Sequence, residues 1–103
     1  GITGEALQVA AQRLIDNLGF NTAVLLGGLP DPTDSEKIIF VAAFGSQVIE
    51  KGLQAGKFVG PIAKICGGGG GGRPNLAQAG GRDATALNRA LEFARDQLRE
   101  ELA

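Results

Sequence analysis

The sequence predicts a small α/β domain of the α+β type, in which a mixed sheet of three to four strands is flanked by helices. Amphipathic patterns at both ends of the chain indicate helices, and two short apolar runs in the first half are typical of buried strands. A glycine-rich loop is then expected before a short strand and a C-terminal helix. All 103 residues are assigned to one domain, because a chain of this length supports a single core.

The first half of the chain predicts one helix and a pair of strands. Thr3 is the expected N-cap of the helix, and Gly19 is the residue that ends it. Residues 22–28 and 37–44 are the predicted strands, which pair as an antiparallel hairpin across a polar loop rich in proline and aspartate. The apolar stripe of the helix recurs at i, i+4, i+7 and i+11, at Leu7, Ala11, Leu14 and Leu18.

The second half predicts two short helices, a strand and a final helix. Ser46 is expected to cap the first short helix. The second helix spans residues 57–66, and Pro61 must either lie in its first turn or cause a kink. Residues 75–80 are the short strand, and Asp83 caps the last helix. The apolar stripe of that helix is Leu87, Leu91, Ala94 and Leu98.

The composition excludes several kinds of chemistry. The chain has no His, so it can form neither a Ser-His-Asp or Cys-His catalytic site nor a His-ligated zinc site. Its single Cys, Cys66, is expected to be a small buried thiol. No apolar run is long enough to span a membrane and no signal peptide is apparent, so a cytoplasmic location and no membrane partner are expected. We therefore predict no catalytic residue, metal ligand or cofactor within this chain.

The net charge of -1 conceals a basic middle segment. Residues 1–36 carry -4, residues 37–82 carry +5 and residues 83–103 carry -2. The basic segment includes the glycine run, with Lys51, Lys57 and Lys64 before it and Arg73 directly after it. A polyanion such as nucleic acid is therefore a suitable partner.

Six consecutive glycines, Gly67 to Gly72, permit two interpretations. A flexible linker is one, since glycine runs behave as random coil. The other is an anion-binding loop, in which backbone N–H groups converge on a phosphate while Arg73 and Arg82 add guanidinium donors. The residues after the run are too few for a separate core, which favours a loop inside one domain. The run lacks the Lys and Ser or Thr of a nucleotide-binding P-loop, so nucleic acid is preferred to ATP.

The segment CGGGGGGRPNLAQAGGRD, from Cys66 to Asp83, closely resembles the C-terminal domain of alanyl-tRNA synthetases, a member of the DHH-associated domain family. The resemblance extends upstream through FVAAFGSQVIEKGLQAGKFVGPIAKICGG and covers nearly the whole chain. Relatives often carry a Lys within the glycine run, around Gly69, and this chain does not.

The resemblance implies a non-catalytic module of a longer enzyme, which is consistent with a chain that starts at Gly1 and has no Met. Such a module binds the elbow of tRNA(Ala), supports aminoacylation and editing by the other domains of the synthetase, and contributes to a homodimer. The parent enzyme would use ATP, Mg and Zn in those other domains. The residues expected to bind RNA are Lys51, Lys57, Lys64, Gly70, Gly71, Gly72, Arg73, Gln78, Gly80, Gly81 and Arg82.

A second hypothesis assigns the chain to a different class. Phosphodiesterases and oligonucleotide exonucleases of the DHH type use a related glycine motif in a substrate-binding domain, while the metal ligands come from a preceding domain. The extended match at RPNLAQAGG favours the synthetase. A third hypothesis, a dimerisation module, is compatible with RNA binding.

Overall fold

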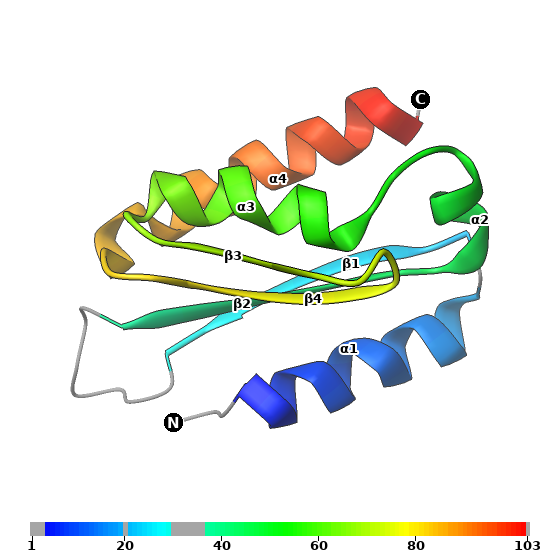
Figure 1. Ribbon diagram of the computed structural model, residues 1–103, viewed down its shortest axis with the longest axis horizontal. Helices are drawn as coiled ribbons and strands as arrows, with labels where there is room; N and C mark the ends of the chain where they lie inside the picture. The colour runs from blue at the N-terminus through cyan, green and yellow to red at the C-terminus, as the bar shows by residue number, and fades with distance from the viewer. Residues whose placement is uncertain (1–3, 20, 30–36, 103) are drawn as a thin grey trace.

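A computed structural model describes residues 4–19, 21–29 and 37–102, which form a four-stranded sheet with helices on both faces (Figure 1). The expected fold class is confirmed. The elements in chain order are α1 (Gly4–Leu18), β1 (Ala23–Gly28), β2 (Ile38–Phe44), α2 (Ser46–Glu50), α3 (Ala55–Ile65), β3 (Gly69–Gly72), β4 (Leu76–Gly81), a 3-10 turn (Ala84–Ala86) and α4 (Leu87–Leu102).

The sheet has the strand order β1-β2-β4-β3, and all three pairings are antiparallel. The mixed sheet expected from the sequence is therefore wrong in its strand directions. β2 and β3 run parallel to each other, but β4 lies between them and pairs with both. Since parallel strands are never neighbours, no parallel ladder forms among the described residues.

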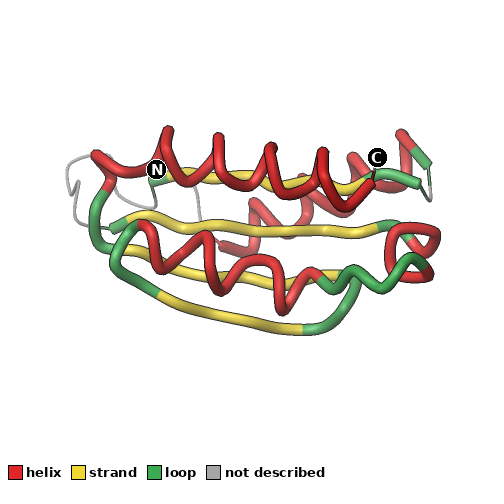
Figure 2. Tube along the Cα trace, turned by 90° about the horizontal axis from the view of Figure 1, so that it is seen from above, coloured by secondary structure: helices red, strands yellow, loops and turns green. Residues whose placement is uncertain are grey.

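The glycine run was expected to be a loop, and this expectation is also wrong. Gly69–Gly72 forms the edge strand β3, which pairs with β4 from Gly69↔Gly80 to Gly72↔Ala77. A strand needs only backbone donors and acceptors for its ladder, so a segment without side chains can still complete a sheet. Figure 2 shows β3 at the outer edge of the sheet, beside α3.

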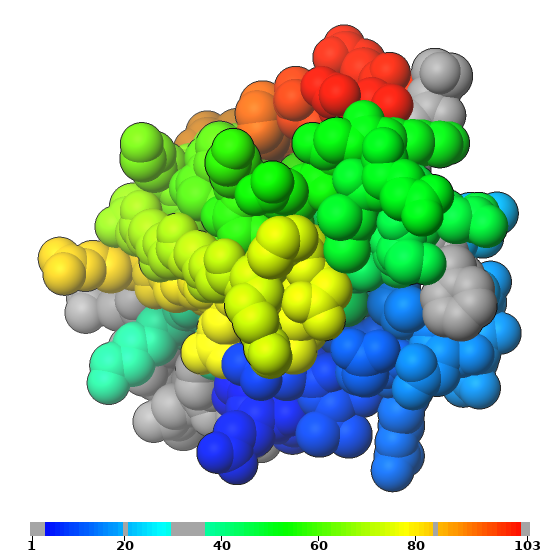
Figure 3. All heavy atoms as spheres, turned by 45° about the vertical axis from the view of Figure 1, so that its right-hand side comes forward, coloured from blue at the N-terminus to red at the C-terminus, as the bar shows by residue number. Residues whose placement is uncertain are grey.

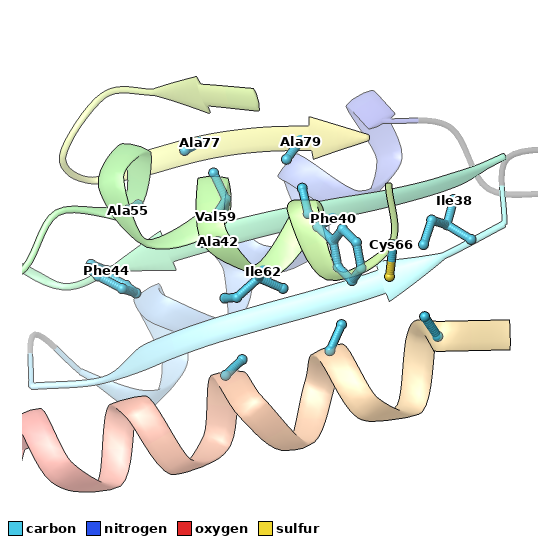
Figure 4. Close-up of a cluster of buried hydrophobic side chains, with 14 of the residues drawn as sticks. Ile38, Phe40, Ala42, Phe44, Ala55, Val59, Ile62, Cys66, Ala77 and Ala79 are labelled. Carbon is cyan, nitrogen blue, oxygen red and sulfur yellow. The ribbon is translucent and has the colours of Figure 1, made fainter. Parts of the chain in front are cut away.

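Two apolar layers hold the helices to the sheet. Phe40, Ala42 and other alternate residues of β2 face α3 and α4, where they pack with Val59 and Ile62 of α3 (Figure 4). The intervening residues of β2, such as Val41, face α1. This period of two is that of a strand buried on both faces, and it makes β2 the centre of the core.

The structure confirms some details of the predicted helices and corrects others. Gly19 ends α1 with a φ of 104° and donates its N–H to the Ile15 carbonyl, as expected. Ile15 is buried, whereas Leu14 and Leu18 are 37% and 60% exposed, so the predicted stripe of α1 is rotated by one residue at its C-terminal end. Ser46 is not a cap: Gly45 holds the N-cap position of α2 without any side-chain hydrogen bond.

Pro61 lies in the middle of α3, beyond the first turn where the sequence would place it most easily. Asp83 caps the 3-10 turn that leads into α4, rather than α4 itself: its Oδ1 atom accepts hydrogen bonds from the backbone N–H of Thr85, at 3.0 Å, and from the Thr85 hydroxyl. The predicted cap Thr3 and the loop at 30–36 lie outside the described residues.

Candidate nucleic-acid interface

Helix α3 is joined at both ends to the hairpin formed by β3 and β4. At its N-terminus, the N–H groups of Ala55 and Gly56 donate to the carbonyls of Pro74 and Arg73, at 2.9 and 3.2 Å. Beyond its C-terminus, the Cys66 carbonyl accepts hydrogen bonds from the N–H groups of the two residues that follow β4, Arg82 and Asp83, at 2.8 and 3.0 Å. The helix and the hairpin therefore form one unit, with the β3–β4 turn exposed at the surface (Figure 3).

Two lysines lie on the outer side of α3. Lys57 and Lys64 are both exposed, and neither makes an ion pair with a described residue. They are seven residues apart, which places them on one side of the helix about 10 Å from each other along its axis. That side is opposite Val59, Ile62 and the other buried residues of α3, so both ammonium groups face solvent.

Arg73 and Arg82 lie near the two ends of α3 because of the backbone hydrogen bonds described above. Both residues are exposed. Since α3 is 11 residues long, the backbones of the two residues are separated by about 16 Å, a spacing that suits contacts to separate phosphates. Lys51 follows α2 and is also exposed. The predicted cations thus surround α3 without converging on one point.

The glycines of β3 do not form the expected anion-binding loop. In an extended strand successive N–H groups point to opposite edges, so they cannot converge on one anion. The Arg73 N–H donates to the Leu76 carbonyl at 3.0 Å, so Arg73 and Leu76 form a hydrogen-bonded pair of the ladder. Hydrogen-bonded and non-hydrogen-bonded pairs alternate along an antiparallel ladder. Gly70 and Gly72 therefore direct their backbone N–H and C=O groups away from β4.

Steric contacts explain why alternate positions of the run must be glycine. A Cβ atom on Gly70 would lie 2.4 Å from the Ala79 Cα atom, and one on Gly68 would lie 1.8 Å from the Gly80 carbonyl oxygen. A Cβ on Gly69 would meet nothing within 4 Å. The run therefore alternates between positions that exclude a side chain and positions that leave room for one.

A glycine on α3 completes this close packing. A Cβ on Gly56 would lie 2.4 Å from the Gly72 carbonyl oxygen, while one on Gly60, a turn later, would keep an ordinary 3.9 Å from the Gly70 oxygen. The sequence does not predict this role for Gly56, because the helix expected there begins at residue 57, whereas α3 begins at Ala55. The glycines thus allow α3 to lie directly against β3.

The remaining predicted residues are not on the same surface. Ala77 and Ala79 of β4 face α3, so Gln78, which lies between them, points to the opposite face of the sheet. Its Oε1 atom accepts a hydrogen bond from Nε2 of Gln8 on α1 at 2.7 Å. Gly81 is a packing position, because a Cβ there would lie 2.7 Å from the Cys66 Cβ. A Cβ on Gly80 would meet nothing closer than 3.7 Å.

A groove between α3 and α4 was not anticipated from the sequence. It has a volume of about 270 Å³ and is lined by Gln54, Lys57, Phe58 and Pro61 from the α3 side and by Phe93 and Glu101 from α4. The Phe93 side chain is 38% exposed, whereas Phe40 and Phe44 are buried. The predicted apolar stripe of the last helix, from Leu87 to Leu98, does not include Phe93, and this was a usable signal that Phe93 lies away from the centre of the core.

Two side chains have shifted pKa values: Cys66, directly after α3, and Asp83, shortly before α4. Burial raises the pKa of the Cys66 thiol, and the negative charge of Asp83 raises it further. The hydrogen bonds from Thr85 lower the pKa of the Asp83 carboxyl. Cys66 is fully buried and unpaired, which makes it a core residue rather than a nucleophile. Among the described residues no group of His, Cys, Asp or Glu could hold a metal ion.

One known protein family accounts for nearly the whole chain. The family model of the DHHA1 domain matches residues 1–100. The chain belongs to the DHHA1 domain family. In agreement with the resemblance found in the sequence, the glycine-rich segment lies within the matched region of this DHHA1 domain.

Alanine–tRNA ligases are among the curated relatives of the domain. One from Prochlorococcus marinus (strain MIT 9303) is 67% identical over 102 residues, and one from Synechococcus sp. (strain WH7803) is 68% identical over the same length. In both cases the match covers 99% of this chain and 11% of the ligase. No catalytic activity is expected of this DHHA1 domain, because it corresponds to so small a part of those enzymes.

A solved structure has the same fold. The C-Ala domain of Aquifex aeolicus alanyl-tRNA synthetase matches 92% of this chain and 80% of its own chain, with a TM-score of 0.80 and 25% identity. Together with the ligase relatives, this match favours a synthetase domain over the substrate-binding domain of a phosphodiesterase or exonuclease. No helix in the part of the DHHA1 domain that the structure describes is long and apolar enough to cross a membrane.

Proposed function

We propose that this domain binds RNA through the outer side of α3 and the ends of the β3–β4 hairpin. The observation that carries the proposal is the exposure of Lys57 and Lys64 between Arg73 and Arg82, on the side of α3 opposite the core. Cations spaced along a helix in this way suit successive phosphates of a nucleic acid backbone better than a single small anion. Lys51 lies before α3 and would add to the same field.

The glycine strand contributes to this proposal through its backbone. Gly70 and Gly72 point their N–H and C=O groups away from β4, and Gly71 lies between them without a side chain. Because the Gly72 carbonyl lies against Gly56 of α3, the part of this edge that an RNA strand could approach is at Gly70 and Gly71. Gly81 is a packing position, Gln78 contacts α1 and Gly80 belongs to β4, so we assign these three residues only an indirect role in shaping this edge.

The RNA is proposed to be tRNA. The relatives are alanine–tRNA ligases by name, and the family resemblance implies that the module recognises the elbow of tRNA(Ala). We propose that the chain acts within such a ligase in the cytoplasm, where other domains carry out aminoacylation and editing with ATP, Mg and Zn. The role of this chain would be to hold the tRNA for those domains.

Titration with a tRNA(Ala) transcript at two salt concentrations tests the binding surface. Replacing Lys57 and Lys64 by Ala should weaken binding and should make the slope of log K against log salt shallower by about 0.7 to 0.9 for each lost phosphate contact. Arg13→Ala is the matched control, because Arg13 is an exposed cation on α1, across the sheet. Equal losses in the α3 variant and the control would contradict the assigned surface.

A second titration tests the two arginines. Arg73→Ala combined with Arg82→Ala should weaken binding at low salt more than at high salt, and unchanged affinity would remove both from the site. Footprinting of the bound transcript tests the proposed partner region. Protection at the elbow agrees with the proposal, whereas protection confined to the acceptor stem overturns it.

We also propose that α1 contributes to a homodimer. Leu14 and Leu18 lie one turn apart near the C-terminus of α1, beside its buried face, and are 37% and 60% exposed. Sedimentation of the chain at increasing concentration should detect association, and Leu18→Lys should abolish it. A monomer at high concentration would remove this role for the chain.

A further inference from the structure

We infer that the groove between α3 and α4 holds one unstacked base of the bound RNA, with the base stacked on Phe93. This inference rests on the proposed RNA binding and adds a site to it. The groove begins directly beside Lys57, which is one of the two exposed lysines of α3 and also lines the groove. A backbone held by the α3 lysines could therefore place a base in the groove without leaving this side of the molecule.

The aromatic lining of the groove suits a flat, apolar group. Phe93 is 38% exposed, so part of its ring is available for a ligand. Phe58, on the opposite helix, is held by the core: its ring lies 5.3 Å from that of the buried Phe44, at an angle of 54°. Pro61 adds a rigid surface to the same lining. Aromatic side chains of this kind stack on unpaired bases with little dependence on sequence.

The polar groups of the groove are matched to a base rather than to a phosphate. The Glu101 carboxylate lines the groove and would repel a phosphate, but it can accept hydrogen bonds from the amino groups of guanine, adenine or cytosine. Because Pro61 has no N–H, the carbonyl of Lys57, a residue that lines the groove, lacks its usual helical donor four residues later. The groove is thus lined by a carboxylate, and an ammonium group lies at its rim.

The size of the groove suits a single small group. Its volume of about 270 Å³ lies just below the range of about 300 to 1,000 Å³ typical of pockets for drug-sized ligands. One base with part of its sugar is a suitable occupant, whereas an amphipathic helix would need a groove that accepts anchors over several turns. The cation at the rim and the anion inside favour a nucleotide over an apolar peptide.

The chain contains no Trp and no Tyr, so a single Trp can report on the groove. Phe93→Trp places that probe in the proposed base site, and Val9→Trp places it on the outer side of α1, where Val9 is 54% exposed, as a matched control. Addition of the tRNA(Ala) transcript should quench the fluorescence of the first variant and leave the second nearly unchanged. Quenching of the first variant without RNA, dependent on protein concentration, would instead indicate self-association and would overturn the inference.

Binding of the same transcript to Phe93→Leu gives an independent measurement. Leu keeps the groove apolar but cannot stack, so affinity should fall about tenfold. The salt dependence should stay the same, because no phosphate contact is lost. Unchanged affinity together with no quenching overturns the base site but leaves the proposed RNA binding intact. If the wild-type chain shows no salt-dependent binding to the transcript, the proposed function fails and the base site fails with it.

Discussion

Alanine substitution at neighbouring glycines of β3 should have opposite effects on stability. Gly70→Ala would place a Cβ atom 2.4 Å from the Ala79 Cα atom and 2.5 Å from both the Ala79 Cβ atom and the Gln78 oxygen. Gly69→Ala would place its Cβ in open space. Neither glycine has a positive φ, so the difference between the two variants comes from the space available rather than from backbone strain.

The size of the effect follows from these distances. Ordinary contacts of a Cβ atom lie at 3.4 Å or more, so β3 must move about 1 Å away from β4 to admit the new methyl group at position 70. Overpacking of this kind costs about 1 to 3 kcal/mol. At position 69 the alanine restricts the unfolded chain without a clash and should stabilise the fold by about 0.5 kcal/mol. The two variants should therefore differ by about 1.5 to 3.5 kcal/mol.

Urea unfolding followed by far-UV circular dichroism measures this difference. At about 4 °C per kcal/mol for a chain of this size, the melting temperatures should differ by about 10 °C. The slope of the unfolding free energy against urea should be similar in both variants, which shows that the same structure unfolds. Stabilities within about 0.5 kcal/mol of each other, or a larger loss for Gly69→Ala, would refute the packing explanation of the glycine run.

The contacts of α3 and the shifted pKa values lead to three more predictions. Gly56→Ala should destabilise the chain by about 1 to 3 kcal/mol, because β3 approaches α3 closely at this residue. Gly60→Ala should stabilise the chain by up to about 1 kcal/mol, because a Cβ there meets no close contact. Thermal unfolding of both variants measures the difference. The Cys66 thiol, which is buried and has a raised pKa, should react with a thiol reagent far more slowly in the native chain than in urea; equal rates would place it at the surface. The pKa of Asp83 is lowered in the folded state, so its contribution to stability is present above the unfolded pKa of about 3.9 and is lost as the pH falls through the folded pKa. Asp83→Ala should therefore destabilise the chain at pH 7 and should make its stability less dependent on pH below about 4, as urea unfolding at several pH values would show.

Local patterns predicted the elements that carry their own signals. The periodic apolar residues of α4, from Leu87 to Leu98, required no knowledge of the rest of the fold, and neither did the cap at Asp83 or the glycine that ends α1. The composite motif from Cys66 to Asp83 also led to the correct family, because sequence resemblance does not depend on knowing the local structure.

Elements that depend on distant partners were predicted less well. Nothing in six identical glycines indicates a strand, since the ladder of β3 comes from its pairing with β4 and its cover from α3. Similarly, Leu14 and Leu18 are as apolar as Leu7, and only the position of the sheet decides that Ile15 is buried in their place.

The candidate site divides in the same way. The sequence by itself determined that the cations concentrate in residues 37–82 and that the chain has no His with which to perform catalysis. Only the tertiary structure decided that Lys57 and Lys64 share the outer side of α3, that Gln78 turns toward α1, and that Phe93 lines a groove. The physical reason is that charge and composition belong to the chain, whereas exposure and proximity arise from how α3, β3 and α4 pack against one another.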